Sequence, residues 1–378
     1  MWQESNLGDL RWSRVLRSKE RIDRLRLDPD RGSMQQSCLG VGSRSPGRLW
    51  QWFAWTAANE SNGAGHTLGS LMHTAFLLAA GFGTRLRPLT EARPKPLLPV
   101  CGIPMLDYAL AHVRSHGHSK VMVNAHYLWQ DVAVWAEAND VTLQVELPIV
   151  LGTGGGLRSA LPNLGDSVVI VNADILSDVD LTALVNAIPE NGASMALRHD
   201  ADAKNIGPVE ANDAGTVVRI TQVVPSDEGV SGTHFTGVHA MSNAAIARIP
   251  DDGEQCVIRT SYKEMVPKHR VGSVLHAGSW VDVGKPGAYL EANMAVLDGR
   301  VPTPIDPWTR GSKGDGGSWV GPNARVDGKI DHSVIGADAV VPVDASLKNC
   351  VVWDGVTVPA GAHENVIVYD GGSLLQID

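Results

Sequence analysis

From residue 75 onward, short apolar runs alternate with longer stretches in which apolar residues recur at helical spacing. The runs expected to form strands are 75–80, 120–124, 141–145 and 167–172, and the last of them is almost wholly apolar. Continuous apolar strands between helices are typical of a sheet covered on both faces. Between these runs, 105–115 and 128–138 have the spacing of amphipathic helices. This alternation predicts an α/β domain with a mostly parallel, Rossmann-like sheet and helices on both faces. Ligands of such sheets bind at the carboxyl ends of the strands.

The last part of the chain changes to a six-residue period. Apolar residues recur at that spacing at Ile335, Val341 and Leu347, and less cleanly at Trp353 and Pro359, with small or β-branched residues four places later at Ala339, Ala345, Val351 and Thr357. Val320 and Val326 continue the spacing upstream, with a three-residue phase break between. Such a period predicts a short left-handed parallel β-helix over 318–378, with a β-sandwich tail as the alternative. Residues 301–317 are expected to form the linker before it. An exposed end coil would offer a surface for homo-oligomerisation.

The first 71 residues lack this regularity. They hold ten Lys and Arg against seven Asp and Glu, and include five tryptophans. Met72 stands just before the first apolar run. We expect 1–71 to be a disordered extension or a translated upstream stretch, with a targeting or partner-binding arm as the alternative.

Composition narrows the classes of function. The 378 residues suffice for two or more domains, and 43% hydrophobic with 19% charged residues is typical of a soluble globular protein. The net charge of −9 argues against nucleic-acid binding. The four cysteines form no CxxC pair, which argues against a zinc site or disulfide framework. No membrane span or signal peptide is apparent, so we expect a cytoplasmic protein.

A glycine-rich turn, Leu-Ala-Ala-Gly-Phe-Gly-Thr-Arg, follows the first apolar run and ends at Arg85. Gly81 and Gly83 have no Cβ, so the backbone can bend and bring its N–H groups close to an anion. Arg85 offers a planar fork of donors to phosphate oxygens, and Lys95 offers a compact charge between two prolines. The spacing matches neither a Walker A loop nor a Rossmann fingerprint. By itself it therefore predicts only an anion site.

Two carboxylates follow in positions suited to a metal. Asp174 stands at the tip of the apolar run 168–172, and Asp282 lies in the segment Trp-Val-Asp-Val-Gly that ends at Gly284. A helix-capping role for Asp174 and a surface position for Asp282 are the alternatives. A triphosphate close to carboxylates needs a divalent ion, usually Mg²⁺ held by one or two Asp together with phosphate oxygens.

A second glycine-rich stretch, Leu-Gly-Thr-Gly-Gly-Gly, spans 151–156 and leads into sequence with helical character from 157. A glycine loop before a helix allows close approach by a flat or polar ligand, with the helix N-terminus facing it. A flexible linker is the alternative interpretation.

In this order along the chain, the first loop with its Pro-Lys-Pro segment, the second loop and the Trp-x-Asp-x-Gly segment resemble the sugar-1-phosphate nucleotidyltransferases, or NDP-sugar pyrophosphorylases. The resemblance implies Arg85 and Lys95 as catalytic residues and Mg²⁺ shared by Asp174 and Asp282. It implies nucleotide contacts at Ala79, Ala80, Gly81, Gly83, Thr84, Gly152, Thr153 and Gly154. Two shorter matches, 206–209 and 234–242, imply sugar contacts at Gly207, Thr236 and Gly237.

The chain also departs from that family. Many members carry a Glu-Lys-Pro segment whose lysine holds the sugar phosphate, whereas 219–225 here has Gln222 in place of the acid and no lysine after it. The basic residues that can supply the charge instead are Arg198, Arg219, Lys263 and Lys268. The departure leaves the sugar open, and leaves room for a regulatory homologue that binds nucleotide sugar without turnover.

The resemblance implies a reaction of NTP with sugar 1-phosphate in a domain spanning 72–300, by in-line attack on the α-phosphate. The motifs and the β-helix are most similar to mannose-1-phosphate guanylyltransferases, which slightly favours GTP. The triple glycine 154–156 resembles muramate-1-phosphate uridylyltransferases. A hexose-1-phosphate uridylyl- or thymidylyltransferase and a non-catalytic sensor stay open, and an acyltransferase is disfavoured because no acyl-CoA site is apparent.

Overall fold

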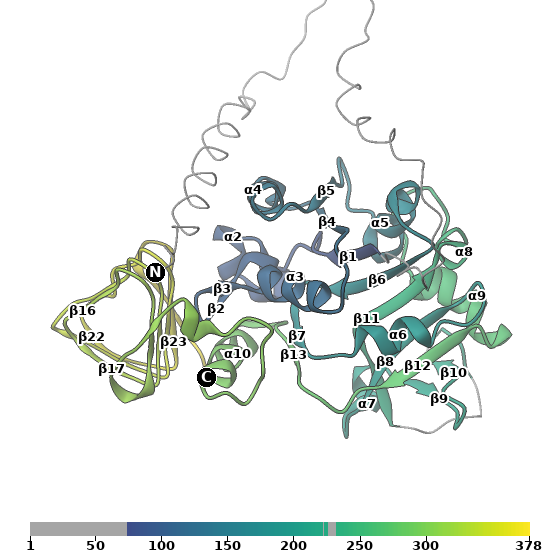
Figure 1. The fold of residues 1–378 in the computed structure, drawn as a ribbon. Coiled ribbons are helices and arrows are strands. Elements are labelled where there is room, and N and C mark those ends of the chain that lie inside the picture. The colour runs from purple at the N-terminus through teal and green to yellow at the C-terminus, as the bar shows by residue number, and fades with distance from the viewer. Residues whose placement is uncertain (1–73, 222, 226–231) are drawn as a thin grey trace, which may run out of the picture.

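The computed structural model describes residues 74–221, 223–225 and 232–378, so the expectation for 1–71 lies outside the described residues. A seven-stranded sheet forms the centre of the first part, in the order β12-β8-β11-β6-β1-β4-β5 (Figure 1). The bounds are β1 Thr74–Leu78, β4 Val121–Ala125, β5 Thr142–Val145, β6 Ser167–Asn172, β8 Ala193–His199, β11 Thr233–Ser242 and β12 Val271–Leu275. β11 runs antiparallel to both of its neighbours, and the remaining pairs are parallel. The predicted mostly parallel sheet is therefore confirmed.

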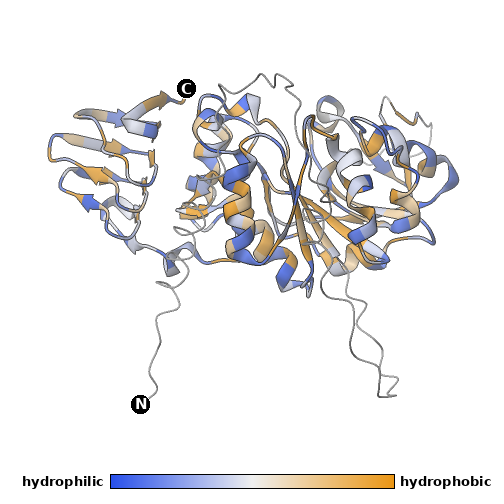
Figure 2. Cartoon of the chain, turned by 90° about the horizontal axis from the view of Figure 1, so that it is seen from above, coloured by the Kyte–Doolittle hydropathy of each residue, from blue (hydrophilic) through white to orange (hydrophobic). Residues whose placement is uncertain are grey.

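Helices cover both faces of this sheet, because its strands alternate their side chains between two apolar cores. Ala75 and Leu77 of β1 face one core, and Phe76 faces the other. The first core is closed by α3 (Met105–Ser115), α4 (Trp129–Asn139) and α6 (Leu181–Asn186), and the second by α5 (Gly152–Ala160), α8 (Asn243–Ile246) and α9 (Lys263–Met265). Figure 2 shows the apolar strands enclosed between helices whose outer surfaces are polar.

The second glycine stretch corrects one expectation. Its glycines were expected to form a loop before a helix, but they are the first turns of α5. The N–H groups of Gly154 and Gly155 both donate to the carbonyl of Gln255. A Cβ at Gly154 would lie 2.9 Å from the backbone nitrogen of Val257. The glycines therefore let the segment 255–257 pack directly against the start of this helix.

The C-terminal part forms stacked parallel strands. One side is built by β15 (Trp319–Val320), β18 (Val334–Ile335), β21 (Val351–Val352) and β23 (Val366–Tyr369), which pair in parallel in that order. The other sides comprise β16 (Arg325–Val326) with β19 (Val340–Val341), and β17 (Lys329–Asp331) with β20 (Ala345–Lys348) and β22 (Gly361–Glu364). This arrangement agrees with a parallel β-helix. Its left-handed sense stays a prediction.

The coils differ in one respect from ideal hexapeptide repeats. Trp319 pairs with Val334, Val334 with Val351, and Val351 with Ile367, so each turn is shorter than three full hexapeptides. At the ends of this side, β14 (Ser312–Lys313) and β24 (Ser373–Gln376) pair antiparallel with the outermost strands. The stretch expected as a linker thus contributes a strand of its own.

A long helix joins the two parts. α10 (Pro286–Leu297) lies between the first part and the β-helix in Figure 1, and one apolar cluster includes residues from all three. Trp319 is fully buried in this cluster, where a Cβ at Gly102 or Gly311 would come within 2.2 or 2.3 Å of its ring. The β-helix therefore shares its core with the domain that carries the glycine loops.

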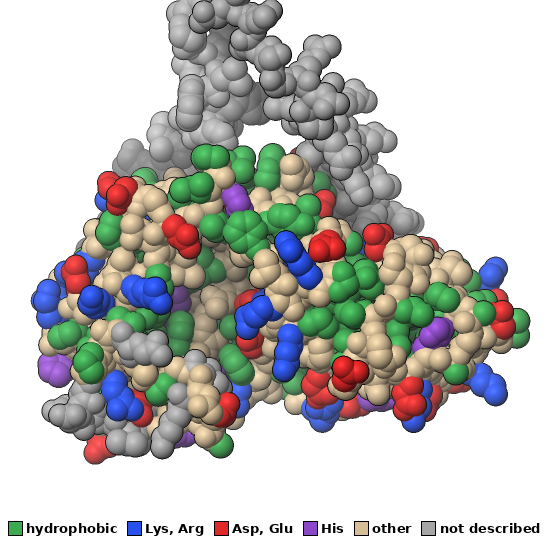
Figure 3. Space-filling model, turned by 180° about the vertical axis from the view of Figure 1, so that it is seen from behind, with side chains coloured by type: hydrophobic (Ala, Val, Ile, Leu, Met, Phe, Trp, Pro, Cys, Tyr) green, Lys and Arg blue, Asp and Glu red, His purple; other side chains and the backbone are tan. Residues whose placement is uncertain are grey.

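The charge distribution on the surface and the character of the helices give two further facts. On the face seen in Figure 3, acidic and basic side chains lie interspersed rather than in one basic stripe. Among the described residues, no helix has the length and apolar character needed to cross a membrane.

Candidate active site

A cavity of about 200 Å³ opens where β1, β4 and β6 end. Its lining comes from four segments that the sequence separates: 78–81, Lys95 with Pro96, Val150 with 152–153, and 172–174, together with Asn124. It includes seven of the predicted site residues, which are Ala79, Ala80, Gly81, Lys95, Gly152, Thr153 and Asp174. The cavity lies at the carboxyl edge of the sheet, where ligands of open α/β sheets bind.

Four charged side chains gather at one side of this cavity. Lys95 forms an ion pair with Asp174. The backbone N–H of Val283 donates to the carbonyl of Asp174, and Asp282 pairs with Ile175 across a separate two-stranded antiparallel sheet of β7 (Ile175–Ser177) and β13 (Trp280–Asp282). Arg85 reaches the same place from the first loop, because a Cβ at Gly284 would lie 3.2 Å from Asp282 Oδ2 and 3.5 Å from the Arg85 guanidinium nitrogens. The structure thus brings both predicted catalytic residues to both predicted metal ligands.

Burial and the neighbouring charges shift the pKa of Asp282. Burial raises the pKa of its carboxyl group above the usual value, and the negative charge of Asp174 raises it further, whereas Lys95 and Arg85 lower it. A carboxylate that burial and a second carboxylate both disfavour has much to gain from an added cation. The pair is therefore electrostatically suited to a divalent ion.

The donor set decides what kind of cation fits. The described parts of the chain contain no group of three or more His, Cys, Asp or Glu side chains arranged to hold a metal. Two carboxylates beside a cavity leave most coordination positions to water or substrate oxygens. This is how Mg²⁺ is usually bound in proteins that act on phosphates. Asp174 and Asp282 fit Mg²⁺ held jointly with a phosphate, and do not fit a closed structural metal site.

A buried hydrogen-bond network forms another wall, and the sequence did not predict it. Asn124 accepts the N–H of Ala79 at 2.7 Å and donates to Glu146 Oε1 at 2.7 Å. Glu146 Oε2 accepts the N–H of Leu151, also at 2.7 Å. Burial raises the pKa of Glu146, and its bonds from Leu151 and Asn124 lower it. Asn124 lies near the carboxyl end of a buried strand, as Asp174 does, so its position in the sequence could have identified it in the same way.

Several predicted nucleotide contacts lie beside the cavity rather than in its lining. Gly83 has a φ of 63°, and a Cβ there would lie 2.9 Å from Thr90 Cγ2 and 3.1 Å from Lys95 Cβ. Thr84 begins the next short helical turn and is exposed. Gly154 is buried against Val257. Gly83 therefore permits the tight turn that packs the first loop against the Lys95 segment.

The predicted sugar-side residues fall into two groups. Gly237, with a φ of 83°, lies against the cavity residue Asn172, because a Cβ there would be 2.7 Å from its Nδ2. Thr236 is buried, and its hydroxyl donates to the carbonyl of Ala196 rather than facing the cavity. Gly207 ends the short helix α7 (Ala203–Ile206) and is exposed, with nothing within 4 Å of a Cβ there.

The four basic residues that could replace the absent sugar-phosphate lysine lie at different places in the fold. Arg219 forms an ion pair at 2.7 Å with the buried Glu210. Lys268 lies just before β12, at the amino ends of the parallel strands, and Lys263 begins the short helix α9 five residues earlier. Arg198 stands at the carboxyl end of β8, with its guanidinium 5.0 Å from the centroid of the Trp280 ring. Gln222 lies outside the described residues.

Arg198 is linked to the sugar side through Trp280. Its Nη1 donates to the Trp280 carbonyl at 3.4 Å, and the indole N–H of Trp280 donates to the carbonyl of Thr236 at 2.8 Å. Across the described ranges, no ion pair joins Arg198 to a carboxylate. Of the four candidates, Arg198 is the one whose strand ends at the ligand-binding edge.

Comparison with known proteins agrees with this geometry. The profile of the family described as nucleotidyl transferase matches residues 74–299. Mannose-1-phosphate guanylyltransferase of Mycobacterium tuberculosis is 30% identical over 305 residues, which cover 76% of this chain and 81% of that protein. UTP–glucose-1-phosphate uridylyltransferase of Synechocystis is 26% identical, covering 76% and 85%. N-acetylmuramate α-1-phosphate uridylyltransferase of Neisseria meningitidis is 29% identical, covering 56% and 92%.

The family match spans the whole sheet domain and α10, and therefore includes both glycine segments and both carboxylates. The relatives differ in the sugar and the base that their names give, but all three are named as sugar-1-phosphate nucleotidyltransferases. The resemblance predicted from the motifs is thus confirmed: the chain belongs to the nucleotidyl transferase family, as an enzyme of the sugar-1-phosphate nucleotidyltransferase type.

Proposed function

We propose that the chain transfers a nucleotidyl group from a nucleoside triphosphate to a sugar 1-phosphate, giving an NDP-sugar and pyrophosphate. One observation carries the proposal: Arg85, Lys95, Asp174 and Asp282 converge beside the cavity that the two glycine segments line. Two cations and two carboxylates at one point suit a reaction in which negative charge moves between phosphates. A simple nucleotide-binding site has no need of the paired carboxylates.

The chemistry requires positioning and charge stabilisation. An oxygen of the sugar phosphate attacks the α-phosphorus, and the bond from that phosphorus to the bridging β-oxygen breaks, so the new pyrophosphate carries the developing charge. In this reaction Arg85 and Lys95, which lie beside Asp282 and Asp174, would donate to the departing phosphates. Lys95 must then divide its interactions between Asp174 and the triphosphate. Side chains held in place before the reaction lower the barrier without reorganising during it.

Asp174 and Asp282 are the residues that would hold Mg²⁺. The bound ion would offset charge on the phosphate oxygens and lessen the repulsion between two anionic substrates. The protein's part is to keep both carboxylates close together, through the antiparallel pairing of β7 with β13.

Among substrates, GTP and mannose 1-phosphate are slightly favoured. The support is the 30% identity to the Mycobacterium tuberculosis guanylyltransferase, whose match extends over 76% of this chain and so beyond the sheet domain. The triple glycine of α5 and the Neisseria meningitidis relative favour UTP with a muramate 1-phosphate as the second candidate.

The decisive experiment measures pyrophosphate release across a matrix of nucleoside triphosphates and sugar 1-phosphates with Mg²⁺. We expect release with at least one pair, and most with GTP and mannose 1-phosphate. Release with UTP and muramate 1-phosphate alone would replace the substrate assignment and keep the reaction. Absence of release with every pair, together with tight NDP-sugar binding by calorimetry, would replace catalysis with a sensor function.

The β-helix is also expected to support a homo-oligomer. The strands β14 and β24 cover the two ends of one of its sides, so a partner would have to dock on the other sides of an end coil. Light scattering coupled to size exclusion tests this, and a single-chain mass at high protein concentration would exclude it.

A further inference from the structure

The segment that carries Lys95 is in direct contact with the β-helix. Two residues before this lysine, the guanidinium of Arg93 lies 4.7 Å from the centroid of the Trp353 ring. The same guanidinium reaches Asp354, with Nη1 3.5 Å from Oδ2. Trp353 and Asp354 belong to a coil of the β-helix, more than 250 positions further along the chain. A residue adjacent to the active site thus holds two consecutive residues of the C-terminal part.

A second connection enters the segment from its other end. The indole N–H of Trp353 donates to the hydroxyl of Tyr289 at 3.1 Å. That hydroxyl donates to the carbonyl of Pro99 at 2.6 Å. Trp353 and Tyr289 are both buried, so water does not compete for these bonds. Lys95 therefore lies between two residues, Arg93 and Pro99, that are both tied to the same tryptophan.

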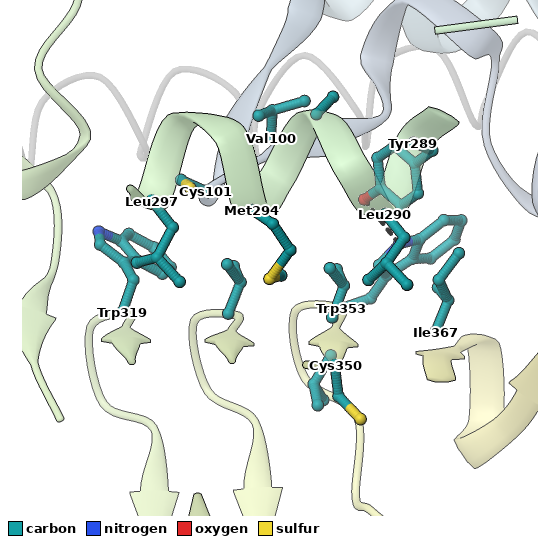
Figure 4. Packing of buried hydrophobic residues seen from close by; sticks show 14 of the residues in the cluster. Val100, Cys101, Tyr289, Leu290, Met294, Leu297, Trp319, Cys350, Trp353 and Ile367 are labelled. Atoms are coloured by element: carbon teal, nitrogen blue, oxygen red, sulfur yellow. Dashed lines mark hydrogen bonds between the residues drawn. The ribbon is translucent and has the colours of Figure 1, made fainter. Parts of the chain in front are cut away.

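The surrounding core makes this connection rigid. Figure 4 shows Leu290, Met294 and Leu297 of α10 pointing toward the coils of the β-helix, with Trp353 beside Tyr289. One turn along the same helix, Asn293 accepts the N–H of Cys101 at 2.9 Å. Close-packed cores transmit displacement rather than absorb it. A shift of the Trp353 coil would consequently move the chain on both sides of Lys95.

The same core extends to the other active-site segments. Leu86 and Leu89, which follow Arg85, belong to this cluster, and so does Val283, which follows Asp282. All four charged site residues are thus next to, or within two residues of, a contact with this core, because Leu176, two residues after Asp174, also belongs to the cluster. The β-helix therefore packs against the same core as the segments that carry the charged site residues.

From these contacts we infer that the C-terminal β-helix sets the position of Lys95, and that Arg93 is the positioning residue through which it does so. The inference rests on the proposed transfer reaction, because it assigns Lys95 to the substrate phosphates. The Arg93–Asp354 pair is partly exposed, with side chains 29% and 42% accessible, so it contributes little to overall stability. Its contribution is the orientation of the segment, and a small misplacement of a catalytic group lowers the rate strongly.

The test compares Arg93→Gln with Lys348→Gln in the full chain. Lys348 forms an exposed ion pair at 2.7 Å with Glu364 on the β-helix, away from the Lys95 segment, and serves as the matched control. For Arg93→Gln we expect kcat to fall about tenfold with little change in the KM for either substrate. Arg93→Lys should recover part of the loss. Lys348→Gln should keep the wild-type kcat and a similar melting temperature.

Hydrogen exchange gives a readout that needs no turnover. The short helical turn at Lys95–Leu97 is closed by the N–H groups of Leu97 and Leu98, which donate to Pro94 and Lys95. These amides should exchange faster in Arg93→Gln and at the wild-type rate in Lys348→Gln. Unchanged exchange and an unchanged kcat would each overturn the inference. A wild-type protein that releases no pyrophosphate would defeat the proposed function instead, and the exchange result would still decide whether Arg93 positions the segment.

Discussion

The side-chain amide of Asn124 donates to Glu146 while its oxygen accepts the backbone N–H of Ala79, so one residue joins the first loop to the strand beyond it. Glu146 in turn accepts the N–H of Leu151, the first residue of the second glycine segment. The first loop and the start of α5 are therefore held at a fixed separation by a buried polar network, and such networks are costly to break.

Gly156→Ala should widen that separation. A Cβ at Gly156 would lie 2.6 Å from Glu146 Oε1 and 3.0 Å from Asn124 Nδ2, so both side chains must move. Loss of a hydrogen bond to a charged group costs about 1.5–3 kcal/mol, which is about 10- to 100-fold in binding. We expect the KM for the nucleoside triphosphate to rise by that factor in steady-state assays.

Gly287→Ala is the matched control for that substitution. Its Cβ would meet only Ile377 Cγ2 at 3.6 Å, an ordinary contact, and alanine favours the helix α10. This variant should keep the wild-type KM. An equal rise of KM in both variants would show that the effect is not specific to the Asn124–Glu146 network.

Asp282→Asn should remove one of the two proposed metal ligands, the carboxylate whose pKa burial and then Asp174 raise. Loss of one stabilising group at a reacting centre typically lowers kcat about 10²- to 10³-fold, or about 2.7–4 kcal/mol. We expect a loss of that size, together with a higher Mg²⁺ concentration for half-maximal rate. Asp344→Asn, at an exposed position of the β-helix, is the control. Wild-type turnover and Mg²⁺ dependence in Asp282→Asn would refute the assignment of the metal ligands.

Part of the convergence of the four charged residues could be expected from the sequence, because some of them come shortly after buried strands. Arg85 and Asp174 come shortly after apolar runs, and parallel strands place such positions at one edge of the sheet. The β-helix was predicted by its period, and α3 was predicted with the bounds that it has. These features depend on local sequence patterns and on general rules of sheet topology, so they can be predicted from the sequence alone.

The residues that the sequence left out depend on pairings that no local pattern specifies. Glu146 meets Asn124 because β4 pairs with β5 in a register that sets Asn124 opposite Gln144. Arg93 meets Trp353 only because the β-helix packs against α10. The helical glycines of α5 were expected as a loop, since glycine propensity disfavours helix, but close packing against the backbone of 255–257 outweighs propensity there.

Arg198→Gln should weaken the binding of the sugar 1-phosphate. Arg198 stacks on Trp280 at the ligand-binding edge, and the other three candidate cations are ion-paired or lie at the amino edge. Removing a charged hydrogen bond to phosphate costs about 1.5–3 kcal/mol. The KM for sugar 1-phosphate should rise about 10- to 100-fold while the KM for NTP stays the same. Lys268→Gln is the control, and the same selective rise in that variant would shift the assignment to Lys268.

The stability of the sheet domain should fall as the pH decreases below 6.5. His239 is fully buried, hydrogen-bonded to the Tyr262 hydroxyl at 2.8 Å, and burial lowers its pKa from 6.5 to about 3. A depressed pKa means that the unfolded chain binds a proton that the folded chain refuses, so the stabilisation is present above pH 6.5 and is lost as the pH falls toward 3. Urea unfolding at pH 7 and pH 5 should differ by about 2 kcal/mol from this residue alone. His239→Phe lowers stability at both pH values by leaving Tyr262 without its partner, but the difference between them should shrink by that amount. An unchanged difference in His239→Phe would contradict a neutral buried histidine at this position.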